Sequence, residues 1–254
     1  MLVSTATLWR IARRDLSARI RGLRLLAVCL FLGVATLAAI GSLTAGIADE
    51  LANRGQTILG GDISVEISQR EATGAEKAEL RKLGAVSETV RLRAMAIAGD
   101  SVLSELKAVD AAYPLYGKLT LASGAKAAQP GIGEIYIAPA MANRLDVGLG
   151  DSLRFGNASF RVTGIIDEEP DRLGEGFTLG PVAIIGMASL PATGLIQPGS
   201  MYEAKYRVKL PAGADAEAIA KTLEKQFATA GWDVDSRENG APGTRRFIER
   251  MGQF

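Results

Sequence analysis

Residues 25–48 read LLAVCLFLGVATLAAIGSLTAGIA and contain no charged side chain. At about 1.5 Å per residue, a helix of this length extends roughly 36 Å, more than the ~30 Å hydrocarbon core of a bilayer. A core helix of a soluble protein is usually shorter and polar along one face, whereas this stretch is apolar all round. A cleavable signal peptide would have a shorter basic region and a shorter apolar run. The sequence therefore predicts an uncleaved transmembrane helix over residues 25–48.

Charge is distributed unevenly on the two sides of this stretch. Residues 1–24 contain six arginines and one aspartate, a net charge of +5, whereas residues 49–254 contain 23 basic and 27 acidic residues, a net charge of −4. A basic flank next to a membrane span stays in the cytoplasm. We therefore expect a cytoplasmic N-terminus, with the bulk of the chain on the other side of the membrane.

The basic flank itself has the pattern of an amphipathic helix, with apolar residues on one half of a helical wheel and most arginines on the other. Such a helix can lie among lipid headgroups, where arginines meet anionic lipid and a tryptophan sits at the interface. A generic positively charged flank without a further role is the alternative. The membrane-interface residues predicted by the first interpretation are Trp9, Arg10, Arg13, Arg14, Arg21 and Arg24.

The sequence offers no recognisable catalytic machinery. It has no histidine, no GxGxxG or Walker motif and no G-x-S-x-G elbow, and its one cysteine, Cys29, lies inside the predicted span. Lysine-based or paired-carboxylate catalysis stays open, but no constellation for it can be placed. Lysines and arginines of the exported part are scattered among more numerous acids, which argues against a nucleic-acid surface. We therefore expect no catalytic residue, no cofactor and no metal site.

The densest acidic cluster is Asp167-Glu168-Glu169-Pro170-Asp171. Carboxylates close together could bind a hard cation, but the spaced ligands and the glycine turn of a calcium loop are missing. We predict a solvated loop here.

Hydrophobic periodicity predicts an α+β domain after the span. The pattern gives a strand, a helix and two strands over residues 57–110, and a strand, a helix and a strand over 200–238, which together form a split βαβ lobe. Many short strands with small turns over residues 111–199 indicate an inserted, small barrel-like lobe. The predicted segments are 1–24 (amphipathic helix), 25–48 (span), 49–243 (exported domain) and 244–254 (start of a helix that leads to a second span).

Several motifs, taken in order, resemble those of the MacB/FtsX-type permeases of ABC transporters, in particular the large YbbP-like members. The segment 8–16, LWRIARRDL, resembles the N-terminal elbow helix of that family, and LGGDI (59–63) resembles the start of its exported core. The further matching segments are VGLGDSL (147–153), FRVTGI (160–165), EPDR (169–172) and GPV (180–182). The resemblance covers nearly the whole chain, although each motif is weak individually.

This resemblance implies a periplasmic core domain with a porter-like lobe and a small α/β barrel lobe, anchored in the bacterial inner membrane. It implies a cytoplasmic ABC ATPase and a second permease copy or paralogue as partners, together with membrane lipid and a periplasmic substrate or partner protein. The family has at least four spans, so the chain is expected to be the N-terminal part of a longer permease. In this interpretation a continuous helix through residues 45–54 would act as a lever between membrane and domain. A single-span periplasmic adaptor or sensor is the alternative, and a membrane-anchored envelope enzyme is a third hypothesis.

Overall fold

The structure, a computed structural model, describes residues 26–43, 55–172 and 180–238. It consists of two units, Met1–Glu50 and Leu51–Phe254. In the first unit, Leu26–Leu43 form a helix with a mean hydropathy of 2.3, none of which is buried. This helix lies within the predicted span and is long and apolar enough to cross a membrane. The remainder of that span, the predicted interface helix over residues 1–24, the predicted lever over 45–54 and the predicted terminal helix over 244–254 lie outside the described residues.

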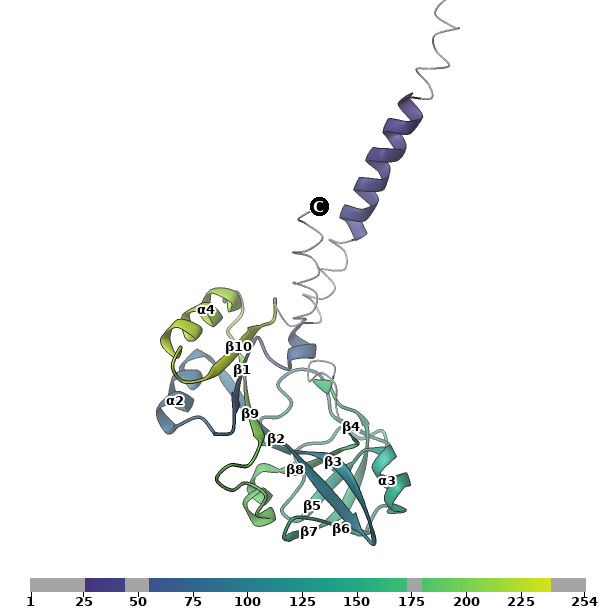
Figure 1. The fold of residues 1–254 in the computed structure, drawn as a ribbon, viewed down its shortest axis with the longest axis vertical. Coiled ribbons are helices and arrows are strands. Elements are labelled where there is room, and N and C mark those ends of the chain that lie inside the picture. The colour runs from purple at the N-terminus through teal and green to yellow at the C-terminus, as the bar shows by residue number, and fades with distance from the viewer. Residues whose placement is uncertain (1–25, 44–54, 173–179, 239–254) are drawn as a thin grey trace, which may run out of the picture. The chain divides into compact units, whose positions relative to one another are not determined.

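The second unit contains a four-stranded antiparallel sheet with the order β10-β1-β9-β2. Its strands are β1 (Ile63–Ser68), β2 (Ala85–Ala98), β9 (Tyr202–Lys209) and β10 (Trp232–Ser236). Helix α2 (Gly74–Leu83) connects β1 to β2, and α4 (Ala216–Gln226) connects β9 to β10. Both helices cover the same side of the sheet (Figure 1). This arrangement confirms the predicted split βαβ layout, which we call the porter-like lobe.

Local signals explain where these helices begin. Thr73 caps α2 by accepting from the backbone N–H of Glu76, while the Glu76 carboxylate accepts from the backbone N–H of Thr73. This reciprocal capping box satisfies two backbone donors that have no partner inside the helix. Asp215 caps α4 through the backbone N–H of Ala218. The apolar face of each helix packs on the inner face of the sheet, with Val65, Leu80, Val90, Tyr206, Leu223 and Val234 buried there.

The remaining long strands close into a six-stranded barrel. Beyond β2, the ring consists of β3 (Asp100–Val109), β8 (Val182–Gly186), β5 (Glu134–Ile137), β7 (Ala158–Glu168) and β6 (Ser152–Phe155). Each strand pairs with the next in this order, and β6 pairs back with β2, so the ring has no free edge. Helix α3 (Pro139–Leu145) contacts β3 and β7, and the 3₁₀ turns η2 (Met187–Ser189) and η3 (Pro191–Thr193) follow β8. A small barrel-like lobe is thus confirmed.

The segment after β3 forms an outer layer on part of the barrel. It includes the short strand β4 (Thr120–Leu121), which pairs with β7. Tyr113 and Leu119 from this segment pack against the outward-facing side chains of the barrel strands and make a second, smaller core with Val109, Ile166, Val182 and Ile184. This segment therefore buries part of the barrel exterior.

The two lobes share the long hairpin of β2 and β3. The N-terminal part of β2 pairs with β9 of the porter-like lobe, whereas its C-terminal end pairs with β6 of the barrel. The predicted lobe boundaries at residues 110 and 200 stay a prediction, but the strand pairing places this hairpin in both lobes. The hairpin therefore connects the two lobes, and one continuous core extends across both of them.

Candidate functional site

A buried group of polar side chains lies where the porter-like lobe, the barrel and the outer layer meet. Two of the sequence motifs singled out above, LGGD at 59–62 and EPD at 169–171, come together there. Gly60 is the point of contact: a Cβ atom added to it would lie 2.7 Å from Nε of Arg207 and 3.3 Å from Cβ of Asp171. Motifs that are more than one hundred residues apart in the chain thus form one site.

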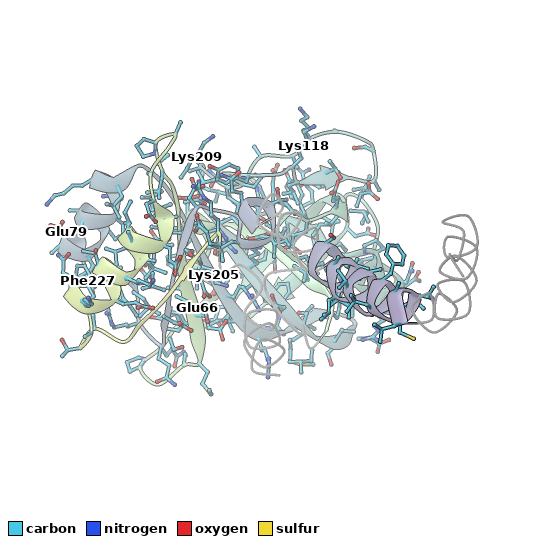
Figure 2. The ribbon with its side chains drawn as sticks, turned by 90° about the horizontal axis from the view of Figure 1, so that it is seen from above. Glu66, Glu79, Lys118, Lys205, Lys209 and Phe227 are labelled. Carbon is cyan, nitrogen blue, oxygen red and sulfur yellow. The ribbon has the colours of Figure 1, made fainter. Side chains whose placement is uncertain are left out.

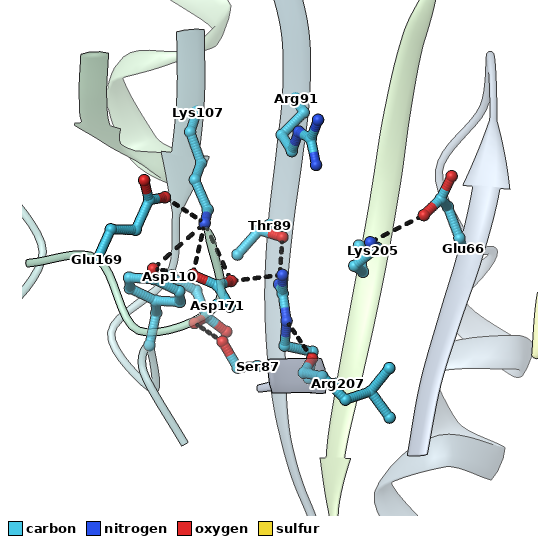
Figure 3. Close-up of polar contacts among 12 residues, drawn as sticks. Glu66, Ser87, Thr89, Arg91, Lys107, Asp110, Glu169, Asp171, Lys205 and Arg207 are labelled. Carbon is cyan, nitrogen blue, oxygen red and sulfur yellow. Dashed lines mark hydrogen bonds and ion pairs between the residues drawn. The ribbon is translucent and has the colours of Figure 1, made fainter. Parts of the chain in front are cut away.

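Asp171 is the centre of this group, which we call the Asp171 cluster (Figure 3). Its carboxylate forms ion pairs with Lys107 Nζ at 2.9 Å and with Arg207 Nη2 at 2.5 Å, and it accepts from the Tyr113 hydroxyl at 2.6 Å. Lys107 Nζ also donates to Glu169 Oε1 at 2.7 Å. The side chains of Lys107, Asp171 and Arg207 are at most 1% exposed. These contacts join a barrel strand, the loop after β7 and a strand of the porter-like lobe.

The other two nitrogens of Arg207 also form hydrogen bonds. Nη1 donates to Thr89 Oγ1 at 2.7 Å, and Nε donates to the backbone carbonyl of Leu59 at 3.1 Å. A buried guanidinium is tolerated only when its donors find acceptors. Arg207 therefore fastens the segment before β1 to β2 and to the loop that carries Asp171.

The charges of the Asp171 cluster balance, since Lys107 and Arg207 face the carboxylates of Glu169 and Asp171. Burial by itself raises the pKa of Asp171, but the neighbouring guanidinium and ammonium groups outweigh burial and lower this pKa well below its usual value. Burial raises the pKa of the Tyr113 hydroxyl well above its usual value. Tyr113 therefore stays protonated, and its hydroxyl donates a hydrogen bond to Asp171.

A second carboxylate, Asp62, holds the segments through which the chain enters and leaves the domain. It is 1% exposed and accepts four hydrogen bonds, each 2.8 Å long. Its donors are Gln56 Nε2 from the entering segment, Arg237 Nη1 from the leaving segment, the Tyr116 hydroxyl from the outer layer and the backbone N–H of Leu210. We call this arrangement the Asp62 clamp.

The hydrogen bonds of the Asp62 clamp keep the Asp62 carboxylate ionised. Burial raises the pKa of Asp62, but hydrogen bonds from Tyr116, Arg237, Leu210 and Gln56 outweigh burial, so that the net pKa is lowered. Burial and the bond to Asp62 raise the pKa of Tyr116 to about 12. The clamp is therefore in its charged, fully bonded form at neutral pH.

Small residues allow the segments of the clamp to approach closely. A Cβ atom on Gly55 would lie 2.2 Å from the backbone carbonyl oxygen of Arg237, so the entering and leaving segments touch at this point. A Cβ atom on Gly117 would lie 2.4 Å from Cβ of Pro170. Side chains at these two positions would push the segments apart.

The prediction of a solvated acidic loop at residues 167–171 is wrong for its second half. Asp167 and Glu168 are exposed, but Glu169 is 8% and Asp171 1% exposed. The cause is that two cations, Lys107 on β3 and Arg207 on β9, neutralise these carboxylates in the interior. Sequence reasoning also missed Lys107 and Arg207, because each lies at a strand position that alternation assigns to the solvent face.

The side chains of these two groups connect segments of the domain to one another. In the described ranges no set of three or more His, Cys, Asp or Glu side chains is placed to hold a metal ion. The functional groups of Lys107 and Asp171 are buried and engaged by neighbouring side chains. The predicted membrane-interface residues Trp9, Arg10, Arg13, Arg14, Arg21 and Arg24 lie outside the described part of the chain and stay a prediction.

Comparison with known proteins identifies the family of this chain. The sequence model of the family described as "MacB-like periplasmic core domain" matches residues 25–226. An uncharacterized ABC transporter permease, YbbP of Escherichia coli strain K12, is 32% identical over 183 residues, which are 71% of this chain and 22% of the relative. The chain thus spans less than a quarter of the length of that curated permease.

Two solved structures are also similar. The periplasmic region of MacB from Actinobacillus actinomycetemcomitans matches with a TM-score of 0.48 and 11% identity, covering 76% of this chain and 95% of that one. The extracellular domain of the noncanonic ABC-type transporter YknZ from Gram-positive bacteria matches with a TM-score of 0.45 and 12% identity, covering 68% of this chain and 100% of that one. The family model and the sequence relative together confirm the resemblance: the chain belongs to the MacB-like periplasmic core domain family of ABC transporter permeases.

Proposed function

We propose that this domain is the part of an ABC permease that converts ATP hydrolysis by a separate cytoplasmic subunit into movement outside the membrane, either to extrude a substrate or to do mechanical work in the envelope. The domain contributes no catalytic group and acts as a transmission element. The Asp62 clamp is the observation that carries this proposal.

The clamp suits transmission because one buried carboxylate binds both ends of the domain. A displacement of the entering segment reaches Asp62 through Gln56, and a displacement of the leaving segment reaches it through Arg237. Asp62 lies directly before β1, and its backbone N–H donates to the carbonyl of Val208 on β9. From β9, Arg207 connects to the Asp171 cluster and so to the barrel. Force applied at the chain ends would therefore move both lobes together.

The surroundings proposed for the domain follow from the family. We propose a bacterial inner membrane location with the N-terminus in the cytoplasm, an ABC ATPase subunit, and a second permease copy or paralogue. The basic flank at residues 1–24 would lie on membrane lipid, and a periplasmic substrate or partner protein would meet the domain. We further propose that the chain is part of a longer permease, a proposal supported by its 22% coverage of the YbbP relative. Reading the coding sequence beyond Phe254 for further apolar spans beside an ATPase gene tests this last point.

The coupling proposal is tested with the permease that contains this chain, reconstituted in liposomes with its ATPase. In a Cys29→Ser background, a spin label at Asp100 on the exposed hairpin tip reports nucleotide-driven movement of the domain relative to a label on the partner permease. We expect Asp62→Ala to keep ATP hydrolysis within about twofold while removing most of the nucleotide-driven distance change. Glu224→Gln, an exposed substitution outside the clamp, is the matched control. An unaltered distance change in Asp62→Ala would rule out the clamp as the transmission element.

A further inference from the structure

An open cleft of about 560 Å³ lies between the porter-like lobe and the barrel, away from the Asp62 clamp and beyond the covered end of the Asp171 cluster. Its floor is the outward face of β9, β2 and β3, where Glu203, Arg91, Arg93 and Glu105 lie side by side. Its two walls are the end of β1 around Gln69 and the loop that ends at Ser200. Neither the Asp62 clamp nor the proposed transmission of force uses these side chains.

The floor of the cleft contains one ion pair and two further charged side chains that are not part of it. Arg91 Nε and Glu105 Oε1 are 2.9 Å apart, with side chains 13% and 7% exposed, so these two groups neutralise each other. Across the hairpin Glu105 lies opposite Arg93, but its carboxylate pairs with Arg91 instead. Within the described ranges Arg93 and Glu203 form no ion pair or side-chain hydrogen bond, although both line the cleft. The cleft therefore presents one available positive and one available negative charge.

The strand register sets the spacing of these two charges. Arg91 is directly opposite Glu203, and Arg93 is two residues further along the same face of β2. Diagonal neighbours of this kind have Cβ atoms about 7 Å apart. Residues i and i+2 on one side of an extended chain are separated by roughly the same distance. An extended segment with an acidic and a basic side chain two positions apart would thus meet both charges.

The walls of the cleft are held in place before any ligand binds. The backbone N–H of Gln69, which has a φ of 61°, donates to the carbonyl of Tyr202 at 2.8 Å. On the other wall, the Ser200 hydroxyl donates to the carbonyl of Leu195 at 2.9 Å and accepts from the backbone N–H of Gln197 at 2.9 Å. A binding surface that is ordered in advance loses less conformational entropy on binding.

The rest of the lining distinguishes a peptide from a purely apolar ligand. Leu195 and Met201 offer apolar contact, and Tyr202 adds an aromatic ring with a hydroxyl, but seven of the eleven lining residues are serine, glutamine or charged. Pockets for apolar small molecules are instead lined mainly by hydrophobic side chains with few polar groups. We propose that this cleft binds an extended segment of a partner protein in which an acidic and a basic residue are two positions apart, the acid on Arg93 and the base on Glu203.

Binding of defined peptides to the full chain in lipid nanodiscs tests this proposal. The probe is an acetylated and amidated Ala-Glu-Ala-Lys-Ala peptide with a dye at one end, followed by fluorescence anisotropy, and the neutral analogue Ala-Gln-Ala-Gln-Ala is its control. We expect saturable binding of the charged peptide, weakened about threefold to tenfold by Arg93→Gln and by Glu203→Gln. Arg144→Gln and Glu224→Gln, exposed substitutions outside the cleft, should leave the affinity unchanged.

Two singly charged peptides assign each contact. Arg93→Gln should no longer distinguish the peptide with Glu alone from the neutral analogue, yet should still distinguish the peptide with Lys alone, and Glu203→Gln should do the reverse. The proposal would be overturned if the charged and neutral peptides bound equally well or if the binding did not saturate. It would also be overturned if Arg93→Gln or Glu203→Gln left the affinity for the charged peptide unchanged. Displacement of the peptide by lysophosphatidylglycerol that requires Arg93 but not Glu203 would also overturn it and would assign the cleft to an amphiphile. The assay needs no nucleotide, so its outcome is independent of the coupling experiment.

Discussion

The Asp171 cluster and the open cleft lie on the same face of the same three strands, β9, β2 and β3, but their charged side chains are in opposite situations. Arg207, Thr89 and Lys107 at one end are buried, whereas Glu203 and Arg93 at the other end face solvent. The residue types are alike, so the difference comes from what lies above the strands. At the buried end, Tyr113 of the outer layer and the loop with Glu169 and Asp171 cover the strands.

When other segments cover a charged strand face, the role of its charges changes. A buried cation must be balanced or it destabilises the fold, so the covered charges of the Asp171 cluster serve the structure. An exposed charge contributes little to stability and stays available for a ligand. The Arg91–Glu105 pair at the boundary between the two regions is largely buried, because its side chains are 13% and 7% exposed. Four predictions test this difference between covered and exposed charges, in order of decreasing effect.

Lys107→Met should have the largest effect, because it leaves Glu169 and Asp171 facing Arg207 alone in the interior. We expect a loss of about 3–5 kcal/mol in the free energy of unfolding, measured by urea denaturation of the full chain in detergent. Lys107→Met combined with Glu169→Gln restores the charge balance and should recover about 1–2 kcal/mol of that loss. If Lys107→Met alone lowers the free energy of unfolding by less than about 1 kcal/mol, the buried carboxylates of the Asp171 cluster do not depend on Lys107 for their charge balance.

Gly60→Ala should come second, because Gly60 has a φ of +72° and an added Cβ would lie 2.7 Å from Arg207 Nε and 2.8 Å from its Cδ. Gly99 at the exposed hairpin tip provides a matched control, with a φ of +80° and no atom within 4 Å of an added Cβ. We expect Gly99→Ala to cost about 1 kcal/mol for the left-handed backbone alone. Gly60→Ala should cost about 1–2 kcal/mol more, because Arg207 must move. Equal losses in the same denaturation assay would show that the contact at Gly60 is loose.

The Arg70–Glu76 pair on the helical side of the sheet should show an intermediate effect that depends on pH. Hydrogen bonds from Arg70 lower the Glu76 pKa from 4.5 to about 2 despite burial, and Thr73 contributes further bonds. Because the folded pKa is below the unfolded value, the stabilisation is present above about pH 4.5 and is lost as the pH falls toward 2. We expect Glu76→Gln to lose about 2 kcal/mol at pH 7 and to show a flatter stability profile over this range.

The matched control for that profile is Glu79→Gln, since Glu79 is an exposed residue of the same helix that pairs with Lys82. It should change the free energy of unfolding by less than about 0.5 kcal/mol at any pH in the range. A wild-type profile that is flat between pH 5 and 2, or one shared by Glu76→Gln, would contradict the assignment. Figure 2 shows the Glu79 position at the periphery of the porter-like lobe.

The smallest effects should come from the cleft, where Arg91 and Arg93 are two residues apart on β2. Arg91→Gln breaks the largely buried pair with Glu105 and should cost about 1–2 kcal/mol. Arg93→Gln removes an exposed charge without a side-chain partner among the described residues and should cost less than about 0.5 kcal/mol. Thermal unfolding of the two variants side by side measures the difference. Similar losses of thermal stability in the two variants would mean that Arg93, like the cations of the Asp171 cluster, contributes to the stability of the fold.

Much of the architecture could be predicted from the sequence because it depends on local patterns. The apolar run at residues 25–48 identified the helix Leu26–Leu43, and alternation indicated strands within residues 57–110 and 200–238, where β1, β2 and β9 lie. Periodicity reports which side of an element is apolar, and this property is encoded within one segment.

The tertiary structure alone decided what covers each strand face. Lys107 and Arg207 occupy positions that alternation assigns to solvent, and only the packing of the outer layer and of the EPD loop buries them. Arg93 occupies an equivalent position and lies in an open cleft. The sequence by itself therefore determined the span, the strands and the family resemblance. Whether a given charge is structural or available depended on segments outside the strand that carries it, because burial is a property of the assembled layers and not of that strand.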